Sequence, residues 1–296
     1  MTPRDTLRFT AILILMGAGW GLTQPLSKIA VSTGYGHFGL VFWQLVIGAA
    51  LMTLICLARR TNLPLGLRHL RLYLIIAMIG TVVPNTLSYQ AAVYLPAGIM
   101  SLLLSVIPMF AFAIALALGN DSFQMRRMVG LIFGLMGVLI IIVPSVDLGQ
   151  PVSVFWAMIY LVTALLYAFE GNYVAKWGTQ GLDAFQVMLG SSLVGLLVVT
   201  PLTLGSGQFI LPVLPVQAAQ GALVIASVVH VFVYATYVWL VGRAGPVFAA
   251  QVSYLVTGFG LFWAWLILNE AYASTLWLAL GVIFSGMYLV QPRRAN

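Results

Sequence analysis

Charged residues are scarce in this chain: Asp, Glu, Lys and Arg make up 6% of its 296 residues, whereas 62% are hydrophobic. Soluble globular proteins contain about 25% charged residues. A chain with so few charges lacks the polar groups that would cover a surface in water, so the composition indicates that lipid surrounds most of it. We therefore expect an integral membrane protein.

Residue types that support catalysis or metal binding are also sparse. The single cysteine, Cys56, lies in the apolar run LMTLICLA, which excludes a disulfide framework. The three histidines (His37, His69 and His230) are far apart in the sequence, and no HExxH, GxSxG or aspartate-rich motif is present. A multi-span lipid transferase or intramembrane protease would need such residues. We predict that the chain is not an enzyme and uses neither a metal nor a cofactor.

Long apolar segments make up most of the chain. A membrane-spanning helix needs roughly 20 mainly apolar residues, and turn residues or charges separate ten segments of about this length. The sequence therefore predicts an all-α membrane protein with ten transmembrane helices. The segments are residues 9–31, 38–58, 70–94, 97–118, 125–143, 152–176, 184–204, 217–241, 246–268 and 273–290.

The positions of Lys and Arg predict the orientation of these helices. If the N-terminus is cytoplasmic, twelve of the thirteen Lys and Arg lie in cytoplasmic segments, and the exception, Lys28, lies within the first helix. This distribution follows the positive-inside rule and predicts that both termini are cytoplasmic. The net charge of +7 therefore reflects topology, and we expect no nucleic-acid partner.

The two halves of the chain resemble each other at an offset of 148 or 149 residues. Each half holds five predicted helices, an odd number, so the second half would be inverted in the membrane. Inverted repeats are common in secondary transporters, whose substrate site lies at the repeat interface. We predict two repeats, residues 1–147 and 148–296; a duplication without mechanistic consequence is the alternative. The matching pairs are Lys28 with Lys176, Tyr89 with Tyr237, Pro144 with Pro292, and Asn120-Asp121 with Asn269-Glu270.

Several short motifs occur in the same helix order as in a known family. They are Trp20-Gly21 followed by Lys28, then Ala97-Gly98 with Ser101-Leu102-Leu103 and Pro108, and finally Asn269-Glu270 before a Gly-rich last helix. In this respect the chain resembles the drug/metabolite transporter superfamily, specifically the EamA-type exporters with two five-helix repeats. It departs from that pattern at Asn120-Asp121, where a Glu is more usual. The resemblance implies transport of small metabolites such as amino acids, with export favoured, and does not name the substrate.

Polar side chains inside the predicted spans mark a candidate cavity. Such groups usually face a bundle interior or a water-filled path, and in segments 152–176 and 217–241 they recur every three or four residues, on one helix face. Isolated Ser and Thr elsewhere more often bond to backbone carbonyls. The predicted substrate-binding residues are Glu170, Tyr167, Thr163, His230, Tyr234, Tyr237, Trp20, Gln24, Trp43, Asn85, Tyr89, Ser101, Gln251 and Tyr254.

Glu170 is the only acid well inside a predicted span, six residues before the end of segment 152–176. An isolated carboxylate is costly in a medium of low dielectric constant, so a proton or a cation is expected to compensate its charge. We predict that Glu170 binds a substrate amine, a coupling proton, or both in competition. The alternative is a structural ion pair with Lys176 or Arg243.

Segments 125–143 and 273–290 have glycines in place of polar stripes. Small residues let membrane helices approach closely, so we expect these two helices outside the cavity, as braces or as a homodimer contact. Lys28, near the outer end of the first helix, either extends to the membrane interface or binds an anion in the outer vestibule.

The sequence thus predicts a multi-pass transporter of the inner (plasma) membrane that moves a small metabolite by alternating access. A phosphorylated solute would need several cationic side chains in the cavity, and Lys28 is the one candidate. An amino acid or related amine is therefore favoured; cationic drug efflux and exchange of phosphorylated metabolites are the alternatives. The expected partners are this solute and the lipid bilayer.

Overall fold

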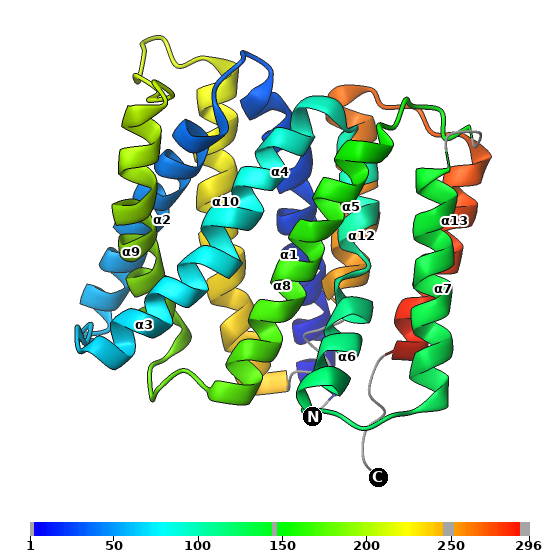
Figure 1. Cartoon of the computed structure of the whole chain (residues 1–296), viewed down its shortest axis with the longest axis horizontal. Coiled ribbons are helices and arrows are strands. Elements are labelled where there is room, and N and C mark those ends of the chain that lie inside the picture. Colours follow the sequence, from blue (N-terminus) through cyan, green and yellow to red (C-terminus); the bar gives the residue numbers. More distant parts are fainter. Residues whose placement is uncertain (1–2, 144–146, 245–251, 291–296) are drawn as a thin grey trace.

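The computed structural model describes residues 3–143, 147–244 and 252–290 of the chain (Figure 1). In these ranges the regular structure is entirely helical. The elements are α1 (Pro3–Val31), α2 (His37–Ala58), α3 (Leu67–Ile76), η1 (Ala77–Val82), α4 (Val83–Tyr94), α5 (Ala97–Leu104), α6 (Ile107–Leu118), α7 (Met125–Ile142), α8 (Val154–Trp177), α9 (Ala184–Gly205), α10 (Ala218–Ala244), α12 (Val252–Leu268) and α13 (Ser274–Val290).

Eight helical stretches within the described residues are long and apolar enough to cross a membrane. One of them, Leu67–Tyr94, combines α3, η1 and α4, and another, Ala97–Leu118, combines α5 and α6. The apolar helices α12 and α13 are shorter, with 17 residues each. The first residues of the predicted segment 246–268 lie outside the described residues. Length and composition thus make this an all-helical, multi-pass membrane protein.

Two of the membrane-length stretches are interrupted next to a proline. The π-helical turn η1 ends directly before Val83 and Pro84, and α5 and α6 are separated by two residues shortly before Pro108. A proline has no backbone N–H and its ring clashes with the preceding turn, so a regular helix is not continued through it without adjustment. In contrast, α1 runs through Pro25 as a single helix.

Helices from the two halves of the chain interleave in the bundle. Helix α1 packs against α10 and α12, whereas α8 packs against α4 and α6. Helix α2 lies along α9, and α5 contacts α12. Figure 1 shows that the first residues of α1 and the last residues of α13 lie at the same end of the bundle. The core therefore forms between the halves rather than within each one.

Helices α7 and α13 form a pair at one edge of the bundle (Figure 1). A Cβ atom built on Gly286 would lie 2.7 Å from the carbonyl oxygen of Gly130 and 2.9 Å from the backbone nitrogen of Gly134. A Cβ atom on Gly137 would lie 2.3 Å from the Ile283 side chain. Gly130, Gly137 and Gly286 therefore allow close packing of these two helices against each other.

Two arginines at the start of α7 cap the last turn of α13. Arg126 donates from Nη2 to the Tyr288 carbonyl at 2.9 Å, and Arg127 donates from Nε to the Val290 carbonyl at 2.7 Å. The Arg127 guanidinium also pairs with Asp121. The last carbonyls of a helix lack intrahelical donors and carry partial negative charge, so cationic donors stabilise that end.

We expect Gly286→Ala to destabilise the protein because its new methyl group meets backbone atoms of α7 that have no rotamer to change. Overpacking of this kind costs about 1–3 kcal/mol, so the melting temperature of the purified protein should fall by several degrees. Gly281→Ala in the same helix is the matched control, because nothing lies within 4 Å of a Cβ atom there. Equal melting temperatures for the two variants would show that the helix contact is looser than described.

Candidate functional site

The polar face of α8 is directed toward α1 and α4. The Tyr160 hydroxyl donates to Gln24 Oε1 at 2.9 Å, and the Tyr167 hydroxyl donates to Asn85 Oδ1 at 2.8 Å. The Thr163 hydroxyl donates to a backbone carbonyl of α4 at 3.3 Å. These side chains occur at three- and four-residue steps and so lie on one helix face. Their hydrogen bonds hold α8 in register with α1 and α4.

Three further predicted site residues also have their donors occupied. The Tyr89 hydroxyl donates to Gln44 Oε1 at 3.1 Å, and the Trp43 indole N–H donates to the Ile210 carbonyl at 2.9 Å. The Ser101 hydroxyl donates to the carbonyl one turn earlier in its own helix at 3.1 Å. Each bond satisfies a polar group inside the bundle, so these residues contribute first of all to helix packing.

Glu170 is half-buried and is placed differently from its hydrogen-bonded neighbours on α8. Its carboxyl group lies against Gly80 of η1, where a Cβ atom would be 2.3 Å from Glu170 Oε1. Among the described residues, no side chain or backbone group forms a hydrogen bond or ion pair with it. The carboxyl group lies within electrostatic range of the Tyr167 and Tyr234 hydroxyl groups. One of these tyrosines, Tyr167, lies on α8 like Glu170, and the other, Tyr234, lies on α10.

The two cations considered as structural partners of Glu170 are engaged elsewhere. Lys176 Nζ donates to the Leu118 carbonyl at 2.7 Å, at the end of α6. The Arg243 guanidinium lies 5.9 Å from the centre of the Trp239 ring. The salt bridges between described residues are Arg59–Asp183, at 3.0 Å, and the pair formed by Arg127. The charge of Glu170 thus has no compensating cation within the described part of the chain.

An aromatic group on α1 and α10 completes the candidate site. The Trp20 ring lies 5.5 Å from the Tyr237 ring and 6.3 Å from the His230 ring, measured between ring centres. His230 and Tyr234 stack at 6.3 Å. All four side chains are half-buried. Their polar atoms, like those of Glu170, have no hydrogen-bond partner among the described residues.

Hydrogen bonding therefore divides the predicted site residues into two sets. The first set holds helices together. The second set, which we call the open polar set, consists of Trp20, Glu170, His230, Tyr234 and Tyr237. Buried polar groups are normally hydrogen-bonded, and side chains that keep partial exposure without a protein partner are available to water or a ligand. These five groups lie on three helices from both halves of the chain.

Two predicted residues do not join this arrangement. The Tyr254 ring packs edge-on against Phe284 of α13 at 5.4 Å, and its buried hydroxyl has no partner among the described residues. Tyr254 is therefore placed toward the α7–α13 pair, away from α8. Gln251 lies outside the described residues.

Sequence reasoning missed the role of Glu270, which follows α12 and is buried. Its Oε1 accepts the Ala97 N–H at 2.7 Å and its Oε2 accepts the Gly98 N–H at 3.0 Å. The Tyr272 hydroxyl donates to Oε2 at 2.9 Å. A carboxylate at a helix N-terminus satisfies free N–H groups and complements the helix dipole. Burial and this neighbouring carboxylate raise the pKa of the Tyr272 phenol, which keeps the phenol protonated as a donor.

Lys28 acts at the same corner of the fold. Its Nζ donates to the Val93 carbonyl at 3.1 Å and to the Leu95 carbonyl at 2.9 Å. Lys28 therefore caps the end of α4 while Glu270 caps the start of α5. These bonds occupy the ammonium group, which weakens the case for Lys28 as an anion-binding residue.

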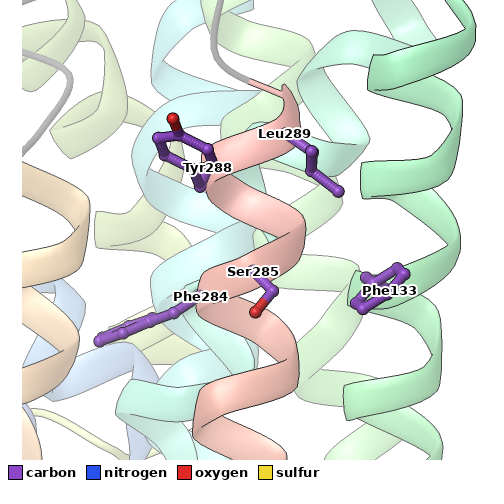
Figure 2. A pocket seen from close by; sticks show the side chains of 5 residues that line it. All are labelled: Phe133, Phe284, Ser285, Tyr288 and Leu289. Atoms are coloured by element: carbon purple, nitrogen blue, oxygen red, sulfur yellow. The ribbon is translucent and has the colours of Figure 1, made fainter.

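A groove of about 500 Å³ lies on α13 and α7, away from the open polar set. Its lining is Phe133, Phe284, Ser285, Tyr288 and Leu289, as Figure 2 shows. Phe133 of α7 and Ser285 of α13 face the space between the two helices (Figure 2). The lining is mainly apolar and has no acidic or basic side chain, so this groove resembles a lipid-facing furrow more than a site for a charged solute.

No group of three or more His, Cys, Asp or Glu side chains that could hold a metal ion occurs in residues 3–143, 147–244 and 252–290. Cys56 is buried and forms no disulfide.

Residues 8–143, from α1 to one residue beyond α7, match the EamA-like transporter family. The chain is 29% identical over 193 residues to the uncharacterized transporter YvbV of Bacillus subtilis (strain 168), covering 63% of this chain and 60% of the relative's length. It is 24% identical over 283 residues to the uncharacterized transporter YoaV of the same organism, covering 91% and 92%. Over residues 8–143 the chain is therefore similar to the EamA-like transporters, and both relatives are transporters.

A solved structure shows the same fold. This crystal structure of a protein is 16% identical in sequence and superposes with a TM-score of 0.64, covering 95% of this chain and 96% of that chain. At this identity the likeness concerns the fold alone. The apolar helices and the family match over residues 8–143 together indicate a multi-pass protein of the inner membrane.

We expect Glu270→Gln to lower the stability of the protein, because a side-chain amide cannot accept from all three donors and its NH₂ group opposes an N–H. Hydrogen bonds to a charged group contribute about 1.5–3 kcal/mol, so thermal unfolding should begin several degrees earlier. Asp147→Asn is the control, since Asp147 is exposed and accepts one local N–H from Gly149. Unchanged unfolding of Glu270→Gln would mean that this cap contributes nothing measurable.

Proposed function

We propose that this protein is a secondary transporter that moves a small amine-bearing solute, with an amino acid or related amine preferred, across the inner membrane. The observation that carries the proposal is Glu170. It is a half-buried acid that pairs with no cation among the described residues, and it lies within electrostatic range of Tyr167 on α8 and Tyr234 on α10. A solute ammonium group would supply the missing positive charge, and a proton would do so in the solute's absence.

The open polar set suits an organic cation. Ammonium groups bind to the faces of Trp and Tyr rings as well as to carboxylates, and the set combines Glu170 with Trp20, Tyr234 and Tyr237. A phosphorylated solute would require cationic donors. Lys28 and Lys176 already donate to backbone carbonyls. Cationic drugs share the favoured chemistry, so they remain the second candidate class.

We further propose ten membrane spans in two inverted repeats, with alternating access and export as the direction. The packing supports this proposal. In the helix order of the two halves, α1 corresponds to α8, α4 to α10, and α6 to α12. Helix α1 packs against α10 and α12, and its counterpart α8 packs against α4 and α6. The family match to residues 8–143 corresponds to one five-helix unit. Residues of the open polar set come from both proposed units, as a site at a repeat interface requires.

In this arrangement α7 and α13 lie outside the solute path as a brace. Their glycine edges are used against each other. A second copy of the chain, if it binds here, would therefore contact exposed side chains such as Phe133 and Tyr288.

The proposed orientation places both termini in the cytoplasm. It is supported by the inward Lys and Arg pattern and by the common end of α1 and α13 in the bundle. A phosphatase that is active only in the periplasm should give no activity when fused after Arg294. The same phosphatase inserted after Gly34, in the loop between α1 and α2, should be active. Activity at Arg294 would contradict the orientation.

Glu170→Gln tests the proposed function. Because no described cation depends on Glu170, the variant should fold and unfold like the wild type. Its uptake in proteoliposomes should fall about tenfold or more, since a charge-assisted contact contributes about 1.5–3 kcal/mol. The substrates tested are a panel of radiolabelled amino acids and polyamines. Hexose phosphates are included to test phosphorylated solutes. Asp147→Asn is the control and should transport normally.

Two results would contradict this function. Wild-type uptake by a well-folded Glu170→Gln variant would leave Glu170 without a transport role. Thermal stabilisation of the wild type by hexose phosphates alone would contradict the amine preference.

A further inference from the structure

The π-helical turn η1 is one of two places where a described membrane-length helix departs from α-helical geometry. Its N–H groups bond one residue further back than in an α-helix, as the Val83 N–H to the Met78 carbonyl shows. Pro84 follows at once and has no N–H to donate. Such turns are rare and occur frequently at functional sites. Here the turn faces the one charged residue of the open polar set.

Gly80 is the contact between this turn and Glu170. A Cβ atom at Gly80 would lie 2.3 Å from Glu170 Oε1, 2.5 Å from its carboxyl carbon and 2.8 Å from Oε2. All three atoms of the carboxyl group are therefore packed against the glycine. Any other residue at this position would displace the carboxyl group or the turn, because contacts below 3 Å are far inside van der Waals separation.

We propose that Gly80 and the π turn form a seat for the Glu170 carboxyl group, so that Gly80 is a positioning residue of the solute site. The inference rests on the proposed role of Glu170 in transport and adds a residue that no polar pattern in the sequence marks. The seat fixes where the negative charge stands relative to the tyrosines of α8 and α10.

The surrounding contacts explain how the seat holds its place. On α4, directly after the turn, the Pro84 carbonyl accepts the Thr163 hydroxyl and Asn85 accepts the Tyr167 hydroxyl. These bonds fix α8 against the helix that carries the turn, one and two helical turns before Glu170. Fixing a Glu side chain costs about 1.5–2 kcal/mol of rotamer entropy. Because the seat already orders the Glu170 side chain before solute binds, less of this entropy is lost during binding.

The position of the carboxyl group can be measured without a known solute. Dicyclohexylcarbodiimide is an apolar reagent that adds to carboxyl groups in apolar surroundings, and mass spectrometry of peptides reports the extent of labelling at each acid. Labelling is compared at one pH and one time for the wild type and for variants. Glu270, which is held by three donors elsewhere in the fold, is the internal reference.

Gly80→Ala should reduce labelling of Glu170 by about fivefold or more, because the new methyl group pushes the carboxyl group off the dry turn toward accessible space. Gly171→Ala is the matched control. It adds the same methyl group next to Glu170, where nothing lies within 4 Å of a Cβ atom, and labelling should stay at the wild-type level.

Glu170→Asp combined with Gly80→Ala provides the rescue. Aspartate is one methylene shorter, so its carboxyl group withdraws from the methyl group of the new alanine. Labelling of residue 170 in the double variant should exceed that in Gly80→Ala alone. Wild-type labelling of Gly80→Ala, or a double variant labelled no better than Gly80→Ala, would overturn the proposal.

Uptake measurements separate this proposal from the transport role of Glu170. If Glu170→Gln takes up solute normally and labelling of Glu170 is reduced in Gly80→Ala, the transport role of Glu170 is contradicted and the positioning role of Gly80 is supported. If Glu170→Gln loses uptake, whereas Gly80→Ala keeps wild-type labelling and uptake, the positioning role of Gly80 is contradicted and the transport role of Glu170 is supported.

Discussion

A polar side chain inside a hydrocarbon layer either bonds to the protein or keeps contact with water, and this constraint organises the whole structure. Most polar groups of the membrane-length helices bond to other groups of the protein. Tyr160, Tyr167 and Tyr89 each bond to an amide side chain of another helix. These bonds hold α8 and its neighbours in place. Five of the predicted site residues lack such a partner among the described residues, and they lie on α1, α8 and α10.

The same constraint accounts for the charged residues at helix ends. Lys28, Glu270, Arg126 and Arg127 each bond to backbone groups that a helix cannot satisfy internally. The contacts of Glu270, Arg126 and Arg127 join elements from the two halves of the chain, whereas Lys28 joins α1 to the end of α4 within the first half. Glu170 is the acid to which neither account applies, because it caps no helix and pairs with no described cation. Function is therefore the better explanation of its presence.

The sequence predicted the helical segments well, because apolar length and turn residues are local signals. It also singled out Glu170 as a lone acid and placed Tyr160, Thr163 and Tyr167 on one face. The role of Glu270 and the contact at Gly80 were not predictable, since both join residues far apart in the chain. Tyr254 was grouped with the cavity by residue type alone, whereas its ring contacts Phe284, and this depends on how α12 is rotated in the bundle.

The proposed transport function depends on solute binding at the open polar set. A density map of the protein, with the amine that most raises its melting temperature bound, would show where the solute lies. We expect density for the ammonium group beside the Glu170 carboxyl group, with the rest of the solute against Trp20, Tyr234 and Tyr237. Density confined to the groove of Phe133, Phe284 and Tyr288 between α7 and α13, with none at Glu170, would contradict this expectation.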